Sequence, residues 1–301
     1  MDELFVKAYV DESEKEHIAR PNLTALQDGW LRLKKNKAAV VCLFALIAIG
    51  LLAVLAPEFS GYSYKETNYD IIYQTPSMAH LFGTDQFGRD LWVRTWMGTR
   101  ISLLIAFVAA LLDLTVGVAY GAVSALTGGR VDAVMQRIIE VLVGIPHLII
   151  VILLMMVMPA GIWTIVVALS ITGWVNMARL VRGSILKLKN QEFVLAARVL
   201  GTSTSGIIWK HLIPNTVGVI VINAMFTIPS AIFTEAFLSF IGIGMQEPKA
   251  SLGVLINNGY QVLRNFPHVL IFPAIVIVLI MVCFSILGDG LRDALDPRMR
   301  K

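Results

Sequence analysis

The chain has 301 residues, of which 56% are hydrophobic and only 15% are charged. Soluble domains carry about 25% charged residues, so this composition excludes an ordinary soluble domain and indicates an integral membrane protein. The net charge of +4 does not indicate a nucleic-acid partner, because the basic residues lie at the ends of apolar runs and are not interleaved with aromatic residues.

Apolar runs define the predicted elements, because a hydrocarbon core of about 30 Å needs about 20 helical residues. The six predicted spans, in chain order, are 38–56, 101–126, the two halves of 141–178, 216–243 and 269–287. The third and fourth spans share one run that would overshoot a bilayer as a single helix, so we place a hairpin break at 159–161. Pro146, Pro229 and Pro273 lie inside these runs and predict kinks. The sequence therefore predicts an all-α integral membrane protein with six transmembrane helices.

Lysine and arginine are distributed unequally between the two sides of this topology. One side holds 19 of them and the other holds 6, so the richer side is cytoplasmic and both termini are predicted inside the cell. The resulting segments are a cytoplasmic N-terminal segment (1–37), the first span (38–56), an extracytoplasmic loop (57–100), a five-helix core (101–288) with a cytoplasmic loop (184–215), and a cytoplasmic tail (289–301).

The cytoplasmic loop 184–215 is too long for a simple connection, which favours a function for it. Asn190 is expected to cap a short helix, and Gly201 to end that helix as a C-terminal cap. One narrow apolar stripe runs along this helix and consists of Phe193, Ala196, Ala197 and Leu200.

A second short helix is expected at 206–212, capped by the hydroxyl residues around Ser203 and ended by Pro214. Two short helices that meet at a glycine would form a knob on the cytoplasmic side. The knob is either a docking site for another protein or an amphipathic turn on the membrane surface, with Phe193 and Trp209 at the interface. The residues alone favour neither alternative.

The stretch 192–201, with 211–214 after it, resembles the EAA coupling motif of ABC importer permeases. The two alanines, the glycine and the proline of that motif are matched by Ala196, Ala197, Gly201 and Pro214. The chain departs from the motif at Leu195, where the motif has glutamate, and at His211 and Ile213, where it has isoleucine and leucine.

Four further stretches resemble the dipeptide, oligopeptide and nickel permeases, and among these the C-type subunit, which is the second permease of its complex. The stretches are 80–90 (HLFGTDQFGRD), 98–103 (GTRISL), 235–244 (EAFLSFIGIG) and 288–297 (GDGLRDALDP). The resemblance implies the type I ABC importer permease fold in a bacterial cytoplasmic membrane.

The same resemblance implies a set of partners: a second homologous permease, two ATPase subunits, an extracytoplasmic solute-binding protein and membrane lipid. ATP and magnesium would be bound by the ATPase subunits, so no cofactor is expected in this chain. The implied substrate is a di- or oligopeptide, and nickel or another small solute is the alternative substrate. A channel or secondary carrier is the alternative from another functional class. The implied ATPase-coupling residues are Glu192, Phe193, Ala196, Ala197, Leu200, Gly201, Ser203 and Pro214.

Motifs of enzymes and metal sites do not occur in the sequence: there is no phosphate-binding P-loop, no HExxH zinc motif and no serine elbow. The two cysteines, Cys42 and Cys283, lie inside apolar runs, where they are expected to pack as small apolar residues. We therefore expect neither enzyme activity nor a metal site in this chain.

Acidic residues within spans are costly and indicate function by default. Asp113 and Glu235 are therefore candidates for lining a translocation path, together with Asn223. The alternative for each acid is a buried hydrogen-bonding partner that fixes helix packing. His147 is expected to bond a neighbouring helix.

The extracytoplasmic loop carries a second group of charged residues, namely Asp85, Arg89, Asp90 and Arg100. These residues are expected either to form a salt-bridged fold over the channel mouth or to contact the solute-binding protein. The sequence pattern does not separate the two roles.

Overall fold

The computed structural model describes residues 25–159 and 161–295, and within them the regular structure is helical apart from an isolated bridge between Thr84 and Asp90. The helices are, in chain order, α2 (Ala25–Leu33), α3 (Lys37–Phe59), a 3-10 turn (Tyr69–Ile71), α4 (Leu91–Thr127), α5 (Gly129–Gly144), α6 (His147–Val157), α7 (Ile162–Leu188), α8 (Glu192–Val199), α9 (Thr204–Ile207), a π-helical turn (Ile208–Leu212), α10 (Ile213–Phe240), α11 (Leu252–Val262) and α12 (His268–Leu295).

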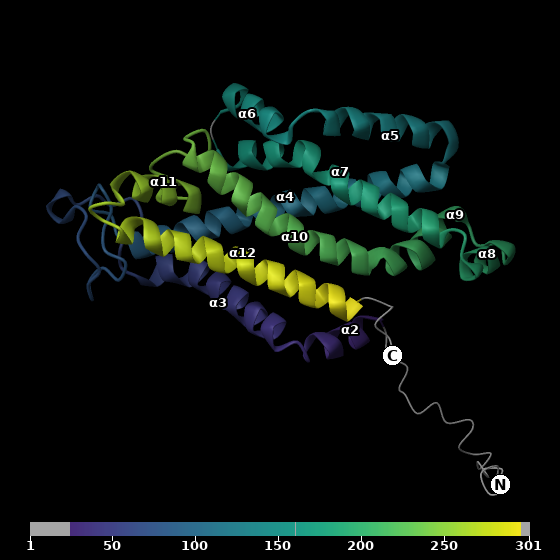
Figure 1. Cartoon of the computed structure of the whole chain (residues 1–301), viewed down its shortest axis with the longest axis horizontal. Helices are drawn as coiled ribbons and strands as arrows, with labels where there is room; N and C mark the ends of the chain where they lie inside the picture. Colours follow the sequence, from purple (N-terminus) through teal and green to yellow (C-terminus); the bar gives the residue numbers. More distant parts are fainter. Residues whose placement is uncertain (1–24, 160, 296–301) are drawn as a thin grey trace, which may run out of the picture.

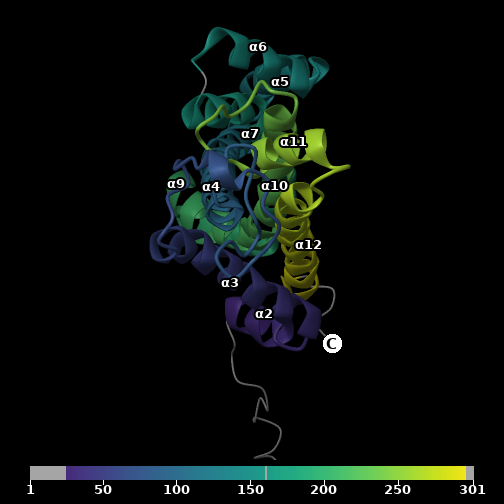
Figure 2. The ribbon, with the colours of Figure 1, turned by 90° about the vertical axis from the view of Figure 1, so that its left-hand side faces the viewer.

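The long helices run along the length of the molecule as a bundle (Figure 1). The loop between α3 and α4 gathers at one end of this bundle, beside α11, whereas α8 lies at the opposite end. Helix α2 and the C-terminal end of α12 both lie towards the α8 end of the bundle (Figure 1). The predicted topology requires this, because it places both termini on the same side as the cytoplasmic loop. Helices α5 and α6 cover one flank, and α2 and α3 the other, in both views (Figures 1 and 2).

Five helices of the described chain are long and apolar enough to cross a membrane, and a sixth span arises if the bent pair α5 and α6 is counted as one. These spans are α3, α4, the pair α5 and α6, α7, the π-helical turn with α10, and α12. The predicted all-α architecture with six spans is confirmed on that count. The tail 296–301 and the first 24 residues of the predicted N-terminal segment lie outside the described residues.

The third span begins earlier than predicted, and the kink predicted at Pro146 is confirmed. Helix α5 begins at Gly129, before the apolar run, and the axis turns by 78° between α5 and α6. Pro146 stands at this bend, as the N-cap of α6, because proline lacks the N–H that would continue the hydrogen bonding of α5. Pro229 and Pro273, by contrast, lie inside α10 and α12, which continue through them.

The second span begins ten residues earlier than predicted, so the extracytoplasmic loop is shorter than 57–100. Asp90 caps α4, its side chain accepting a hydrogen bond from the Val93 amide at 2.8 Å. Charges at Arg94 and Arg100 end the apolar run of the sequence but not the helix, because both guanidinium groups find tertiary partners. The first span likewise extends past Pro57 to Phe59.

The centre of the bundle is a close crossing of α4 and α7. A Cβ atom at Gly121 would lie 2.4 Å from the carbonyl oxygen of Ala178, and one at Gly117 would lie 2.6 Å from the Cβ atom of Met177. Two glycines one turn apart therefore let the two backbones touch, as small residues do where membrane helices pack without a hydrophobic driving force. This contact holds α7 against the middle of α4.

We expect Gly121→Ala to lower the apparent melting temperature of the purified protein in detergent, because the added methyl group forces the two helices apart at a cost of about 1–3 kcal/mol. Gly50→Ala in α3 is the matched control, since nothing lies within 4 Å of its added Cβ atom. Equal melting temperatures for the two variants would contradict the close crossing.

Candidate functional site

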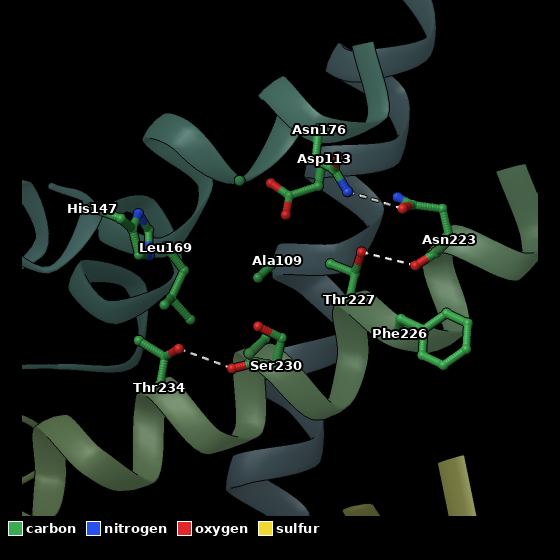
Figure 3. A pocket seen from close by; sticks show the side chains of 12 residues that line it. Ala109, Asp113, His147, Leu169, Asn176, Asn223, Phe226, Thr227, Ser230 and Thr234 are labelled. Carbon is green, nitrogen blue, oxygen red and sulfur yellow. Dashed lines mark hydrogen bonds between the residues drawn. The ribbon is translucent and has the colours of Figure 1, made fainter. Parts of the chain in front are cut away.

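A cavity of about 230 Å³ lies between α4, α6, α7 and α10 (Figure 3). It is lined by Ala109, Asp113, His147, Leu169, Gly173, Asn176, Asn223, Phe226, Thr227, Ser230, Ala231 and Thr234. Most of its polar groups are amides and hydroxyls, and Phe226 and Ser230 at its rim are exposed. The cavity is therefore a polar recess among the membrane-spanning helices.

Asp113 comes from the middle of α4, and only 7% of its surface is exposed. Its carboxylate lies against the backbone of α7, where a Cβ atom at Gly173 would come within 2.3 Å of Oδ2. The glycine thus makes the room that the carboxylate occupies. Among the described residues, Oδ1 of Asp113 has no hydrogen-bond partner.

His147 enters the cavity wall because it is the first residue of α6, placed there by the bend at Pro146. Its Nδ1 atom forms a hydrogen bond with the hydroxyl of Thr172 on α7, so the expected bond to a neighbouring helix is confirmed. The kink predicted at Pro146 is what brings His147 to the cavity, a position that the apolar pattern of the sequence did not indicate.

Amides from two helices meet at the side of the cavity nearest the α8 end. Asn176 on α7 donates from Nδ2 to Oδ1 of Asn223 on α10 at 3.1 Å. The hydroxyls of Thr227 and Thr234 donate to backbone carbonyls one turn earlier in α10. Figure 3 shows these side chains around the same hollow as Asp113.

Glu235, the other acid predicted within a span, does not line this cavity. It is fully buried in α10, where its carboxyl oxygens accept hydrogen bonds from Ser102 of α4 at 2.7 Å and from Ser239 at 2.9 Å. Of the three predicted path residues, the structure brings together Asp113 and Asn223 and leaves Glu235 apart. The contacts of Glu235 are those of a buried hydrogen-bonding partner between α4 and α10.

The loop 60–90, which we call the outer cap, folds over one end of the bundle and is held by buried charges. Asp85 accepts a hydrogen bond from Nε of Arg89 at 2.7 Å and lies 3.1 Å from Nε of Arg94. Both arginines also reach Glu247 in the loop between α10 and α11, and Arg89 does so with two hydrogen bonds of 2.5 and 3.1 Å. The cap is thereby tied to the loop between α10 and α11 at the same end of the bundle.

Glu247 sits between two guanidinium groups, one from the cap and one from α4. Partial burial disfavours its charged form, but the hydrogen bond from Arg89 and the charge of Arg94 outweigh that effect and hold the pKa of Glu247 below its ordinary value. The carboxylate is therefore charged at neutral pH. Asn258 of α11 donates a further hydrogen bond to it at 2.9 Å.

The remaining predicted cap residues serve different contacts. Asp90 accepts from the amide of Val93 and pairs with Nδ1 of His80 at 2.8 Å. Arg100 is not part of the cap, because it lies nine residues past the start of α4 and donates to the carbonyl oxygen of Ala53 at 2.9 Å, in the last two turns of α3. Asp85, Arg89 and Asp90 are all buried. Their geometry is that of a salt-bridged fold.

The cytoplasmic segment around α8 forms two short helical pieces that meet at Gly201, as predicted. Gly201 has φ of 80°, the amide of Thr202 donates to the carbonyl of Ala197, and the Gly201 amide donates to Arg198, which together make a Schellman cap. The predicted N-cap Asn190 is wrong by one residue, since Gln191 holds that position.

The end of the second piece also differs from its prediction. The π-helical turn Ile208–Leu212 continues directly into α10, and Pro214 stands in the first turn of α10 instead of ending a separate helix. The missing proline amide falls directly after the π-helical turn, where the Ile213 amide bonds back to Ile208 and the regular α-helical bonding is already interrupted. The segment is therefore an extension of α10 and not a detached hairpin.

The apolar side chains of α8 are divided between the protein interior and the surface. Val194 and Ala197 face inward and are buried. Phe193, Leu195, Val199 and Leu200 are exposed, the last two by 88% and 84%, and Ala196 is exposed as well. The predicted stripe is thus split, with Ala197 inside and its other members outside.

Comparison with known families identifies the chain. Residues 117–301 match the family model described as "Binding-protein-dependent transport system inner membrane component", and residues 24–76 match "N-terminal TM domain of oligopeptide transport permease C". The chain belongs to this permease family. As a member it is a multi-pass protein of the bacterial inner membrane, in agreement with its apolar helices.

Individual relatives are similar over almost the whole chain. The oligopeptide transport system permease protein OppC of Bacillus subtilis is 48% identical over 99% of this chain and 98% of its own length. The dipeptide transport system permease protein DppC of the same organism is 49% identical over 100% of this chain and 94% of its own. OppC of Escherichia coli is 45% identical over 91% of both.

A solved structure supports the fold. An inward-facing structure of the MetNI methionine ABC transporter matches with a TM-score of 0.56 and 19% identity, covering 68% of this chain and 96% of the matched one. At that identity the likeness shows the fold alone, which is that of an ABC importer permease.

Proposed function

We propose that this chain is the C-type permease subunit of an ATP-driven importer that carries di- and oligopeptides into the cell. The observation that carries this proposal is the identity of 48% and 49%, over nearly the whole chain, with two permeases named for oligopeptide and dipeptide transport. The nickel alternative has no observation in its favour, since the relatives reported above carry peptide names.

The translocation path passes the cavity between α4, α6, α7 and α10. Asp113 and Asn223 line it, and its amides and hydroxyls suit a substrate made of amide groups. Glu235 acts as a packing residue, because its buried hydrogen bonds to α4 leave it outside the cavity. The second permease completes the path from the exposed side of α10, where Phe226 and Ser230 form the rim.

ATP hydrolysis in the partner subunits is coupled to the translocation path through α8. Leu200 and Gly201 form the tip of the docking surface, with Phe193 and Ala196 beside them. Glu192 and Ser203 flank this surface, the buried Ala197 holds α8 against the interior, and Pro214 lies exposed in the first turn of α10. Because α9 and the π-helical turn lead directly into α10, a movement of α8 that is passed across Gly201 to α9 reaches the cavity wall along α10.

The extracytoplasmic solute-binding protein docks on the outer cap. Asp85, Arg89 and Asp90 act from inside the cap by fixing its shape, and Arg100 fixes the base of the cap by joining α4 to α3. A rigid docking face limits the ordering cost of binding, which supports this assignment.

The test is uptake by proteoliposomes that contain this chain with its second permease and two ATPase subunits. Radiolabelled trialanine should accumulate only when the loaded solute-binding protein is outside and ATP is inside. A complex with a non-hydrolysable ATP analogue is the control. Trialanine uptake without ATPase subunits, or uptake of nickel in place of trialanine, would contradict the proposal.

A further inference from the structure

We propose that the cavity contains a binding subsite for the α-ammonium group of the transported peptide, with the carboxylate of Asp113 as its ligand. This subsite rests on the proposed function for its peptide ligand. The chain thus recognises the amino end of the peptide, and Asp113 is the residue that does so.

The first observation is an uncompensated carboxylate. Asp113 is 7% exposed, its Oδ1 atom has no hydrogen-bond partner among the described residues, and its side chain borders the cavity. Buried acids in membrane spans are normally paired, because an unpaired charge costs several kcal/mol. Of the described residues that line the cavity, none is lysine or arginine. A cationic group that enters the cavity would supply the missing partner.

The second observation is that α7 is shaped around this carboxylate. A Cβ atom at Gly173 would lie 2.3 Å from Oδ2 and 2.6 Å from Oδ1. Any other residue at this position would displace the carboxylate from its place. Gly173 itself lines the cavity, so the carboxylate lies along the wall and not across the space. The space in front of it stays open to a ligand.

The remaining walls fit the amino end of a peptide better than its carboxyl end. Asn176, Asn223 and Ser230 offer amide and hydroxyl groups for the first peptide units. The only other titratable group of the lining is His147, whose Nδ1 atom is engaged by Thr172. At about 230 Å³ the cavity is smaller than the roughly 300–1,000 Å³ of pockets that enclose a whole ligand. It therefore receives one end of a peptide.

The charge of the subsite can be measured without any peptide. Ser230→Cys places one thiol at the exposed rim, in a chain whose buried Cys42 and Cys283 are replaced by alanine. In the purified four-subunit complex, the rates of reaction with a trimethylammonium-ethyl and a sulfonatoethyl methanethiosulfonate are compared. Adding Asp113→Asn should lower the ratio of cationic to anionic rate by about tenfold, because one nearby unit charge is removed.

Two variants control this measurement. Glu140→Gln removes an equal charge from the exposed face of α5, outside the cavity, and should leave the ratio unchanged. Asp113→Glu keeps the charge and should preserve the ratio. Rates are expressed per purified complex, so reduced assembly does not alter them. A ratio that Asp113→Asn leaves unchanged would overturn the subsite and assign the carboxyl to helix packing.

Transport supplies the second readout. Uptake of trialanine by the Asp113→Asn complex should fall about tenfold, the loss of one charge-assisted contact, while ATP hydrolysis stimulated by the loaded binding protein persists. Undiminished uptake would overturn the role of the subsite in transport. If the wild-type complex does not carry trialanine at all, the proposed function fails, and the reagent ratio still decides whether the cavity attracts cations.

Discussion

The Gly201→Asp variant is expected to insert into the membrane, to lose its ATPase subunits on purification and to lose uptake. Gly201 has φ of 80°, so a side chain there costs about 1 kcal/mol of backbone strain, which a folded subunit tolerates. Nothing lies within 4 Å of an added Cβ atom, so the subunit itself has space for the aspartate. The loss must then arise in the interface with the ATPase, where a carboxylate would be buried against the partner.

Gly201→Asn is the matched control, because asparagine has the same shape and similar tolerance of positive φ but carries no charge. We expect it to retain more of the ATPase subunits than the aspartate variant does. The measurement is the amount of ATPase that co-purifies with each variant, with trialanine uptake alongside. Full co-purification and transport in Gly201→Asp would refute the docking role of α8.

Apolar length identified the spans, because the membrane imposes a length that each single segment shows, and the proline and glycine of 159–161 located the break. The sequence pattern misplaced the start of α4 by ten residues, because Arg94 and Arg100 are made tolerable by partners in distant segments, Glu247 and the end of α3. It also treated three prolines alike, although only Pro146 stands at a break in the helices. Contacts with distant segments decide where α4 starts and which proline interrupts a helix.

The candidate site likewise combines features that the local sequence predicts with features that depend on tertiary contacts. Asp113 and Glu235 look equivalent in the sequence, since each is one acid in an apolar run. Their difference depends on hydroxyl partners, because Ser102 of α4 reaches Glu235 whereas Asp113 meets a glycine. The Gly201 cap, by contrast, was predicted correctly from residues adjacent in the chain, since a Schellman cap is a local structure.

Replacing Glu247 by glutamine is expected to lower the free energy of unfolding of the outer cap by about 2 kcal/mol, at the low end between an exposed and a fully buried ion pair, because the Glu247 side chain is 35% exposed whereas its arginine partners are buried. The substitution removes the charge that faces Arg89, which is 3% exposed, and Arg94, which is fully buried. Asp85 remains as a partner for both, which keeps the loss at this low end. The cap should then open more often, which limited proteolysis of 60–90 and the apparent melting temperature would detect.

Glu58→Gln is the matched control, because it also removes a carboxylate paired with an arginine, Arg100, but at a side chain that is 65% exposed. Its cost should stay within about 1 kcal/mol. The pH dependence gives a second check. Because the pKa of Glu247 is lowered in the fold, its contribution is fully present above the ordinary carboxyl value of 4.5 and is lost as pH falls through the lowered pKa. The stability advantage of the wild-type cap over the Glu247→Gln variant should therefore disappear only in acid. A stability difference between the two that is independent of pH would contradict the ion pair.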